Sequence, residues 1–561
     1  LAEEDRYKEQ DPYYVLGADG LPADAATFMG PAPLAVTAPV AVAGKPVEMK
    51  TSLQLLRASA QKMSVAEASQ ITGIPQDIIT ALARELTSHG RKACVVSHGG
   101  MMGSNGFYAA YALMTLNALI GNLNYQGGWA YGAGGFKYAE EGPRYNLSTF
   151  PGQIKPRGMP LGRNAPYEKT SEFKRRKEAG QNPYPARDQW CPNAAGLATE
   201  WLTAAMNGYP YGLKALMLWS CNPMYGVPGL RTLIEKPLAD PRRIPLIISM
   251  DPLINESNAF ADYIVPDSIM YESWGFVAPW SGVSTKCMVA RWPVVEPRAA
   301  KTPDGQPIGV ETFLLALARR MNLPGFGPQG HPLPLERPEH WYLRAGANIA
   351  FGGKQPVGDA TDEDIQLSGV DRIAPLLHAS LKEDEWRKVA FLYTRGGRYQ
   401  PAGQSHDEER ADWQTWRFGK PRWLWNDQLG TSRNSLNGKR HSGCATWVPP
   451  SFADGTPLRQ IYTQQEWPLL IVNFKSALQN SYSIATKITR VHPENPVIVH
   501  PVDARRAGLR TGDQARLQTP AGAVKCTVIV HEGVVPGTMA IEHGFGHREL
   551  GARAHVLGHE R

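Results

Sequence analysis

Two apolar runs, Lys214–Pro223 (KALMLWSCNP) and Ile244–Pro252 (IPLIISMDP), decide the fold class of this chain. Each stays apolar along its middle and then ends in small polar residues, which is typical of a strand in a buried parallel sheet. The similar run Lys92–Gly100 (KACVVSHGG) predicts a third strand, and a helix is expected after it over Phe107–Ile120. Strands that alternate with helices favour an α/β fold with a mainly parallel sheet flanked by helices, in which ligands bind beyond the carboxyl ends of the strands.

Two amphipathic helices are expected upstream of these strands, between residues 64 and 90. Ser64 is a suitable N-cap because Glu67 follows three positions later, and Gly73-Ile74-Pro75 separates the two helices. Residues 1–59 are largely Pro- and Ala-rich with little periodicity, so we interpret them as a connector.

The pattern changes to short strands after about residue 385. Strands are predicted in VAFLYTRGG (389–397), PLLIVNFKS (468–476), NPVIVHP (495–501), DQARLQT (513–519), AVKCTVIVHEG (523–533) and GTMAIEHG (537–544). Turn signals such as Gly512-Asp513 and Pro536-Gly537 separate them at a spacing typical of a barrel. The predicted domains are therefore a connector at 1–59, an α/β domain at 60–384 and a β-barrel domain at 385–561.

Composition excludes several classes of protein. The 561 residues include 42% apolar residues, which is typical of a globular chain. The net charge is +7 without a run of like charges, so no nucleic-acid partner is expected. The six cysteines lie far apart, without the spacing of a zinc finger or of a dense disulfide framework.

Glycines and acidic residues mark possible ligand sites at the strand ends. The loop Gly99–Gly106 lies between a predicted strand and a helix, where backbone N–H groups suit a phosphate, although a plain turn explains it as well. Asp251 ends an apolar strand and is equally suited to binding a nucleotide and to capping a turn. Cys221 is more readily explained as a small buried residue than as a nucleophile or metal ligand.

The C-terminal strands are followed by two polar clusters. His543 and His547 have the spacing of a helical metal pair, but the glycines in EHGFGH disfavour a helix, so a loop that contacts a ligand is the better interpretation. Lys475, Ser476 and Asn480 follow a predicted strand and suit either a flat polar ligand or a solvated loop.

Longer strings reveal a resemblance to a known family. They are TSHGRKACVVSHGGMMGSNGFY (87–108), LNALIGNLNYQGG (116–128), EGPRYN (141–146), NESNAFADYIVPD (255–267) and IEHGFGHRELGA (541–552). From about residue 45 onward the chain resembles the catalytic subunits of tetrathionate reductases, which are molybdopterin oxidoreductases of the dimethyl sulfoxide reductase superfamily. The resemblance implies a molybdenum bis(molybdopterin guanine dinucleotide) cofactor, two-electron reduction of tetrathionate to thiosulfate, and a double-psi β-barrel in the C-terminal part.

The resemblance also implies which residues hold the cofactor. By position, the strand-end residues Ser97, His98, Gly99, Asn222, Pro223 and Asp251 would lie beside one guanine dinucleotide. The residues Lys475, Ser476, Asn480, His543 and His547 of the barrel would face the pterins. No metal ligand is assigned within this chain.

The family implies partners and segments beyond this sequence. It carries a [4Fe-4S] cysteine cluster and a molybdenum ligand upstream of the matching region, so we expect the chain to be a C-terminal fragment that is inactive alone. The implied partners are an iron-sulfur electron-transfer subunit plus a membrane quinol-oxidising subunit, and the implied location is the periplasm.

A small oxyanion substrate calls for cationic groups. Tetrathionate is a dianion whose charge grows as two thiosulfates separate, and the planar fork of arginine binds two oxyanion oxygens at once. Arg144 in EGPRYN is the first candidate for a catalytic role and Arg291 in ARWPVV the second, although a loop-bracing role or a surface salt bridge explains each equally well. Polysulfide, thiosulfate, arsenate and selenate reductases of the same superfamily are alternatives, as is a metal-free structural subunit of a respiratory complex.

Overall fold

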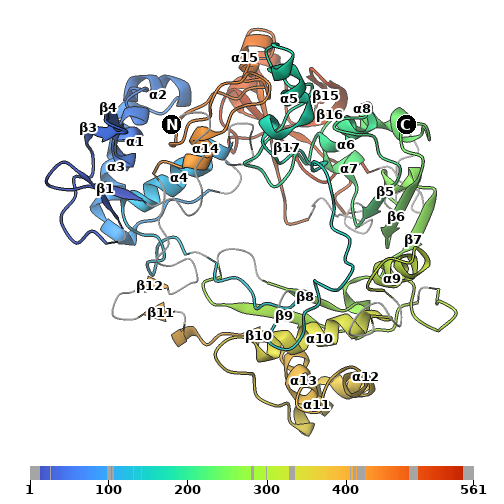
Figure 1. Ribbon diagram of the computed structural model, residues 1–561. Coiled ribbons are helices and arrows are strands. Elements are labelled where there is room, and N and C mark those ends of the chain that lie inside the picture. Colours follow the sequence, from blue (N-terminus) through green and yellow to red (C-terminus); the bar gives the residue numbers. More distant parts are fainter. Residues whose placement is uncertain are drawn as a thin grey trace.

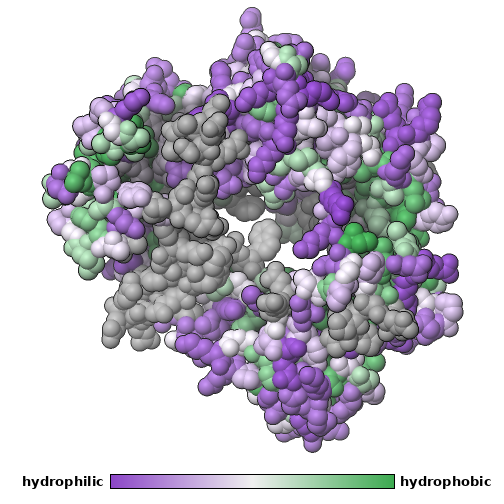
Figure 2. Space-filling view, in the orientation of Figure 1, coloured by the Kyte–Doolittle hydropathy of each residue, from purple (hydrophilic) through white to green (hydrophobic). Residues whose placement is uncertain are grey.

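The packed units of the chain surround a central opening (Figure 1), which remains when side chains are drawn (Figure 2). The computed structural model describes residues 13–25, 27–97, 101, 103, 106–130, 132–139, 142–278, 283–298, 300–326, 335–404, 406–407, 412–413, 424–478 and 491–547. The buried apolar residues fall into separate clusters rather than a single one. The architecture is therefore an open ring with several separate cores.

The N-terminal units are two hairpins and four helices. The hairpins pair β1 (Tyr14–Leu16) with β2 (Pro22–Asp24) and β3 (Thr37–Val42) with β4 (Lys45–Lys50), and the helices are α1 (Ser52–Ala60), α2 (Val65–Thr72), α3 (Gln76–Ser88) and α4 (Gly106–Leu119). The predicted capping box is confirmed, because Ser64 Oγ accepts the Glu67 N–H and the Glu67 carboxylate accepts the Ser64 N–H. Gly73 ends α2 with a positive φ of 73°.

The strand expected at residues 92–100 is absent from residues 92–97, the part of it that the structure describes. There the backbone of Val95 bonds a side chain instead of a neighbouring strand. The buried Asn117 of α4 accepts the Val95 N–H at 3.1 Å and donates to its carbonyl at 2.8 Å. An amide side chain thus takes the place of a strand partner, which apolar patterning does not reveal.

The two runs that open the sequence analysis form neighbouring parallel strands, as predicted. β5 (Leu216–Trp219) pairs with β6 (Ile247–Asp251), and β6 pairs in parallel with β7 (Tyr263–Pro266). The helices α6 (Trp201–Met206), α7 (Pro223–Gly226) and α8 (Leu230–Leu238) accompany this sheet, and Ile234 and Leu238 of α8 join its core. Met217 and Trp219 of β5 are exposed, because they alternate with the buried Leu216 and Leu218 and so lie on the other face of the sheet.

A second sheet and a group of helices form the part of the ring at the bottom of Figure 1. β8 (Gly275–Val277), β9 (Cys287–Arg291) and β10 (Gly397–Tyr399) are antiparallel. The helices are α9 (Val310–Arg320), α10 (Pro338–Phe351), α11 (Asp362–Ser368), α12 (Ala374–Ser380) and α13 (Trp386–Thr394). The strand predicted at 389–397 is wrong up to Thr394, because α13 buries Val389, Leu392 and Tyr393 at helical spacing within the shared core. A short apolar run does not distinguish a buried strand from a buried helix.

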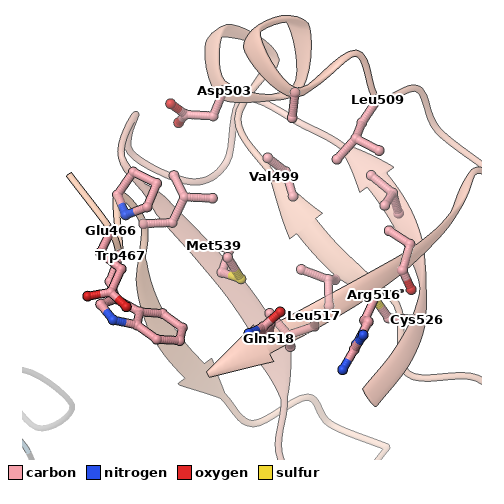
Figure 3. A pocket seen from close by; sticks show the side chains of 16 residues that line it. Glu466, Trp467, Val499, Asp503, Leu509, Arg516, Leu517, Gln518, Cys526 and Met539 are labelled. Carbon is pink, nitrogen blue, oxygen red and sulfur yellow. Dashed lines mark hydrogen bonds between the residues drawn. The ribbon is translucent and has the colours of Figure 1, made fainter. Parts of the chain in front are cut away.

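The C-terminal strands form a mixed sheet in the order β13-β17-β14-β16-β15. They are β13 (Leu470–Phe474), β14 (Val497–Val499), β15 (Gln514–Thr519), β16 (Gly522–Val530) and β17 (Thr538–Glu542), each where the sequence predicted one, with α17 (Pro501–Ala507) after β14. Trp467, Val499 and Met539 point into a cavity of about 410 Å³ in this unit (Figure 3). The mixed α/β class is thereby confirmed.

Short elements connect these units. They are α5 (Ser171–Glu178), α14 (Asp427–Thr431), α15 (Leu458–Ile461) and the paired strands β11 (His406–Asp407) and β12 (Asp412–Trp413). The segment after α14 closes the ring against α4, because the hydroxyls of Tyr108 and Tyr111 donate to the carbonyls of Ser442 and Gly443, each at 3.0 Å. In the described part of the chain, no helix is long and apolar enough to cross a bilayer.

Candidate functional site

Asn222 lies directly beyond β5 and is fixed by the loop that follows β6. Its Oδ1 accepts the Ser257 hydroxyl at 2.8 Å and the Ser257 N–H at 3.2 Å, and its Nδ2 donates to Glu256 at 2.6 Å. Pro223 begins α7 next to it. Ser220, two residues before Asn222, has a φ of +43°, a strained conformation of the kind that often occurs at functional sites.

Asp251 lies at the same edge of the sheet, at the end of β6. Its carboxylate accepts the Leu253 N–H at 3.0 Å and the Asn255 side chain at 3.2 Å. Burial raises the pKa of Asp251, and the charge of Asp267 raises it further. Asp251 thus caps its own turn, at the edge where parallel sheets bind ligands.

A C-terminal loop reaches this edge through His547. Its Nδ1 lies 3.3 Å from both carboxylate oxygens of the buried Glu256, and its ring stacks on Tyr225 of α7 with centroids 3.6 Å apart. The Tyr225 hydroxyl donates to the Phe545 carbonyl at 3.1 Å. The other ring nitrogen of His547, Nε2, is buried and has no hydrogen-bond partner within the described residues. This imidazole therefore has one nitrogen fixed and one available to a ligand.

Lys475 and His543 meet at the end of the C-terminal sheet. β13 and β17 run parallel with Phe474 opposite Glu542, so the residues that follow them are neighbours, and the His543 N–H donates to the Phe474 carbonyl at 2.8 Å. Burial lowers the pKa of His543, and the charges of Lys475 and His547 lower it further. One lysine and two imidazoles thus gather at this point.

Glu542 anchors the other side chains at that sheet end. Burial acts to raise the pKa of Glu542, but hydrogen bonds from Ser476 and from His492, the latter at 2.8 Å, outweigh it and lower the pKa. Asn495 bonds the Glu542 backbone at both its N–H and its carbonyl. Ser476, predicted to face a cofactor, is thus engaged with a carboxylate.

The structure therefore brings together several of the predicted residues from distant parts of the sequence. Those at the two facing edges are Asn222, Pro223, Asp251, Lys475, Ser476, His543 and His547. Ser97 lies in the segment held by Asn117, while His98, Gly99 and Asn480 lie outside the described residues. Sequence reasoning did not select Glu256 or Tyr225, which carry the contacts between the edges. The available signal, the position of Glu256 a few residues after β6, is too weak to indicate a function.

The two arginines proposed for catalysis both have protein partners. Arg144 Nε donates to Glu385 at 2.6 Å, and its Nη2 donates to both oxygens of Asp384 at 2.8 and 2.9 Å. Arg291 donates twice to Ser273, from Nε to the Ser273 carbonyl at 3.3 Å and from Nη2 to the Ser273 hydroxyl at 3.2 Å. These contacts are those of arginines that brace loops, and the substrate role of each stays a prediction.

The facing edges suit a large polar anion. Lys475 supplies a positive charge, His543 and His547 supply ring nitrogens, and Asn222 and Asp251 supply polar groups at the carboxyl end of the parallel strands. Within the described ranges, no group of three or more His, Cys, Asp or Glu residues gathers in a way that could hold a metal ion.

Comparison with known proteins agrees with this chemistry. Residues 476–559 match the family model of the Molydopterin dinucleotide binding domain. The chain is 47% identical to a tetrathionate reductase subunit of Salmonella typhimurium, over 97% of this chain and 54% of that protein. It is 30% identical to a tetrathionate reductase subunit of Archaeoglobus fulgidus, over 89% of this chain and 47% of that protein.

Two further likenesses are more distant. A selenate reductase subunit of Mesobacillus selenatarsenatis is 29% identical, over 90% of this chain and 50% of that protein. The solved structure of acetylene hydratase from Pelobacter acetylenicus aligns with a TM-score of 0.53 at 17% identity, over 88% of this chain and 59% of that chain, and so shows a shared fold alone. The chain spans about half the length of the curated relatives it matches.

Proposed function

We propose that the chain is part of a catalytic subunit that reduces tetrathionate to two thiosulfates, because it is similar over nearly its whole length to tetrathionate reductase subunits and its C-terminal part matches a molybdopterin dinucleotide binding domain. The identity of 47% over 97% of the chain carries this proposal. Selenate reduction is the second candidate, favoured by the 29% identity to a selenate reductase, and the lower identity ranks it behind tetrathionate.

The residues at the facing edges fit a molybdopterin dinucleotide. Lys475 and His543 would offer a cation and a ring nitrogen to its phosphates, and His547 would offer the buried Nε2 that has no partner within the described residues. We propose that the cofactor is the bis(molybdopterin guanine dinucleotide) form. When bound, it supplies the molybdenum that exchanges two electrons with the substrate.

The chain's own residues position and neutralise this cofactor. The Glu256 carboxylate lies against Nδ1 of His547 and fixes the ring, so that its buried Nε2 is the nitrogen that would be left to a bound cofactor. Tyr225 holds the plane of that ring by stacking. Asn222 bonds Glu256 at the end of β5, so the sheet sets the position of the carboxylate that holds the His547 ring.

The finer architecture belongs to the same proposal. We propose that residues 60–384 form the α/β dinucleotide-binding domain, with a mainly parallel sheet, and that 385–561 form a double-psi β-barrel domain. The parallel pairs β5–β6–β7 and the five C-terminal strands support this division. The elements α13 and β10, which follow residue 384, pack in the core of the first part and against its strand β9.

The proposed protein works with other subunits. The relatives are each named as one subunit of a reductase, which supports an assembly of several chains. The partners that we propose are an iron-sulfur subunit plus a membrane quinol-oxidising subunit, with a [4Fe-4S] cluster outside this chain and a periplasmic location. The +7 net charge without clustering agrees with a small oxyanion substrate and no nucleic acid.

The test is expression of the complete gene with molybdenum, followed by metal and pterin analysis and a dye-linked assay on tetrathionate, selenate, thiosulfate and arsenate. We expect stoichiometric molybdenum and the highest kcat/KM for tetrathionate. His547→Ala and Asp251→Ala should lower pterin content, because each lost hydrogen bond to a charged group is worth about 1.5–3 kcal/mol. The exposed His89→Ala is the control.

Three results would contradict the proposal. A wild-type protein without molybdenum would support a purely structural role. A preference for selenate would move the substrate to the second candidate. Unchanged molybdenum and pterin content in His547→Ala and Asp251→Ala would remove these residues from the cofactor site.

A further inference from the structure

A basic cavity lies apart from the candidate cofactor site, between α5 and the segments around residues 157 and 209. Its volume is about 780 Å³. Its lining includes four arginines and one carboxylate, so the formal charge is 4 − 1 = +3, and these residues are Arg157, Glu172, Arg175, Arg176 and Arg187. All of them come from residues 142–278, which the structure describes without a gap.

The one carboxylate of the cavity, Glu172, is already fully engaged. It accepts hydrogen bonds from the hydroxyls of Tyr209 at 2.8 Å and Tyr167 at 3.2 Å, and from the backbone N–H of Arg187 at 3.0 Å. Arg176 Nη2 lies 3.0 Å from it. Glu172 therefore neutralises one arginine and leaves the charge of the others without a carboxylate.

The other three arginines differ in whether the protein holds their side chains in place. Arg187 is held in place, because its Nη2 donates to the Asn207 carbonyl at 2.8 Å and its guanidinium lies 5.3 Å from the centre of the Tyr209 ring. Arg157 and Arg175 are exposed and make no hydrogen bond or ion pair through their side chains within the described part of the chain. They come from different segments, so they can reach two separate ends of one ligand.

We propose that this cavity binds a dianion with two terminal sulfonates. Such an ion belongs to the substrate class of the proposed function, on which this inference rests. The volume far exceeds the space of a single sulfate, so the cavity has room for an elongated ion. The guanidinium fork bonds two oxyanion oxygens at once. Trp190, Tyr209 and Tyr211 line the wall between the charges and suit the less polar sulfur chain of such an ion.

Calorimetric titration of the oxidised, complete protein with tetrathionate tests this site, since no turnover occurs without a reductant. We expect two binding events in the wild type. The double variant Arg157→Ala/Arg175→Ala should lose at least tenfold in affinity at one of them. Lys174→Ala is the matched control, because Lys174 lies on the same helix and carries the same charge but does not line the cavity. Its affinities should stay within twofold.

Further arms separate this site from screening and from the cofactor proposal. Thiosulfate, sulfate and chloride are titrated at equal ionic strength, and the double variant should change only the response to tetrathionate and, more weakly, to thiosulfate. An equal response to chloride would overturn the proposal, as would a single event in the wild type or unchanged binding in the double variant. Thermal melting confirms that the variants fold, and tetrathionate turnover, measured separately, reports on the proposed function alone.

Discussion

Two regions of this molecule place arginine beside a carboxylate that also accepts a tyrosine hydroxyl, and they differ in charge balance. At the loop of EGPRYN, Arg144 meets both Asp384 and Glu385, and Glu385 also accepts the Tyr145 hydroxyl at 2.5 Å. In the cavity beside α5, four arginines share Glu172, which accepts the Tyr209 hydroxyl at 2.8 Å. The residue types are the same in both places. Whether a guanidinium is free to bind a ligand therefore depends on the ratio of carboxylates to arginines around it. Only the fold determines that ratio.

The strongest test of the balanced region is Glu385→Ala. Glu385 is fully buried, and its loss leaves Arg144 half-compensated and the Tyr145 hydroxyl without its acceptor. Removing one partner of a buried ion pair costs about 3–5 kcal/mol. We expect a decrease of that size in the free energy of unfolding of the complete protein, measured with urea. A decrease below about 1 kcal/mol, the range of exposed pairs, would show that the region is solvated.

A second test replaces Arg144 itself. Arg144→Ala removes hydrogen bonds to two carboxylates and should lower the free energy of unfolding by about 2–3 kcal/mol. Arg144→Lys keeps the charge but not the planar fork, so it should recover part of the loss. Urea unfolding is measured together with kcat/KM for tetrathionate. A loss of about tenfold or more in kcat/KM, at unchanged stability and molybdenum content, would instead assign Arg144 to the substrate.

The smallest expected effect concerns the two tyrosines and should be alike in both regions. Burial raises the pKa of Tyr145 and of Tyr209 above the ordinary value of 10.0, and hydrogen bonds to Glu385 and Glu172 also raise it. Since the folded state holds these protons more tightly, the stabilisation is present below pH 10 and is lost as the pH rises above it.

Tyr145→Phe and Tyr209→Phe test this dependence. Each should lower the free energy of unfolding at about pH 8 by about 1.5 kcal/mol and should flatten its decline above about pH 10. Tyr399→Phe, an exposed tyrosine, is the control. A wild-type slope retained in both variants would mean that other groups cause the alkaline loss.

Local signals predicted much of the fold. The capping box at Ser64 and Glu67 and the alternating apolar strands of the C-terminal part specify their elements within a few residues, and the structure confirms them. The failures at 93–97 and 389–394 have a different cause. There the apolar content was recognised, but an amide from α4 and the packing of α13 on α10, both distant in sequence, selected the conformation.

The candidate site divides along the same line. The family resemblance indicated Asn222, Lys475 and His547, which the structure places at facing edges. The sequence did not single out Glu256 or Tyr225, because their role depends on a C-terminal loop that is distant in sequence. His547 of this loop lies 291 residues from Glu256. The cavity arginines were missed for a related reason, since a basic residue in a sequence is by default assigned to a solvated face.

The closure of the ring has a consequence for how the protein is made. Tyr108 and Ser442, whose hydrogen bond joins α4 to the far side of the chain, are 334 residues apart. At a synthesis rate of about 5–20 residues per second, the ribosome needs about 20–70 s to make the second partner after the first. During that interval α4 waits with Phe107 and Leu119 uncovered, and both remain more than half exposed even in the finished chain. We expect slower translation to lengthen this interval and so to lower the soluble yield of the chain.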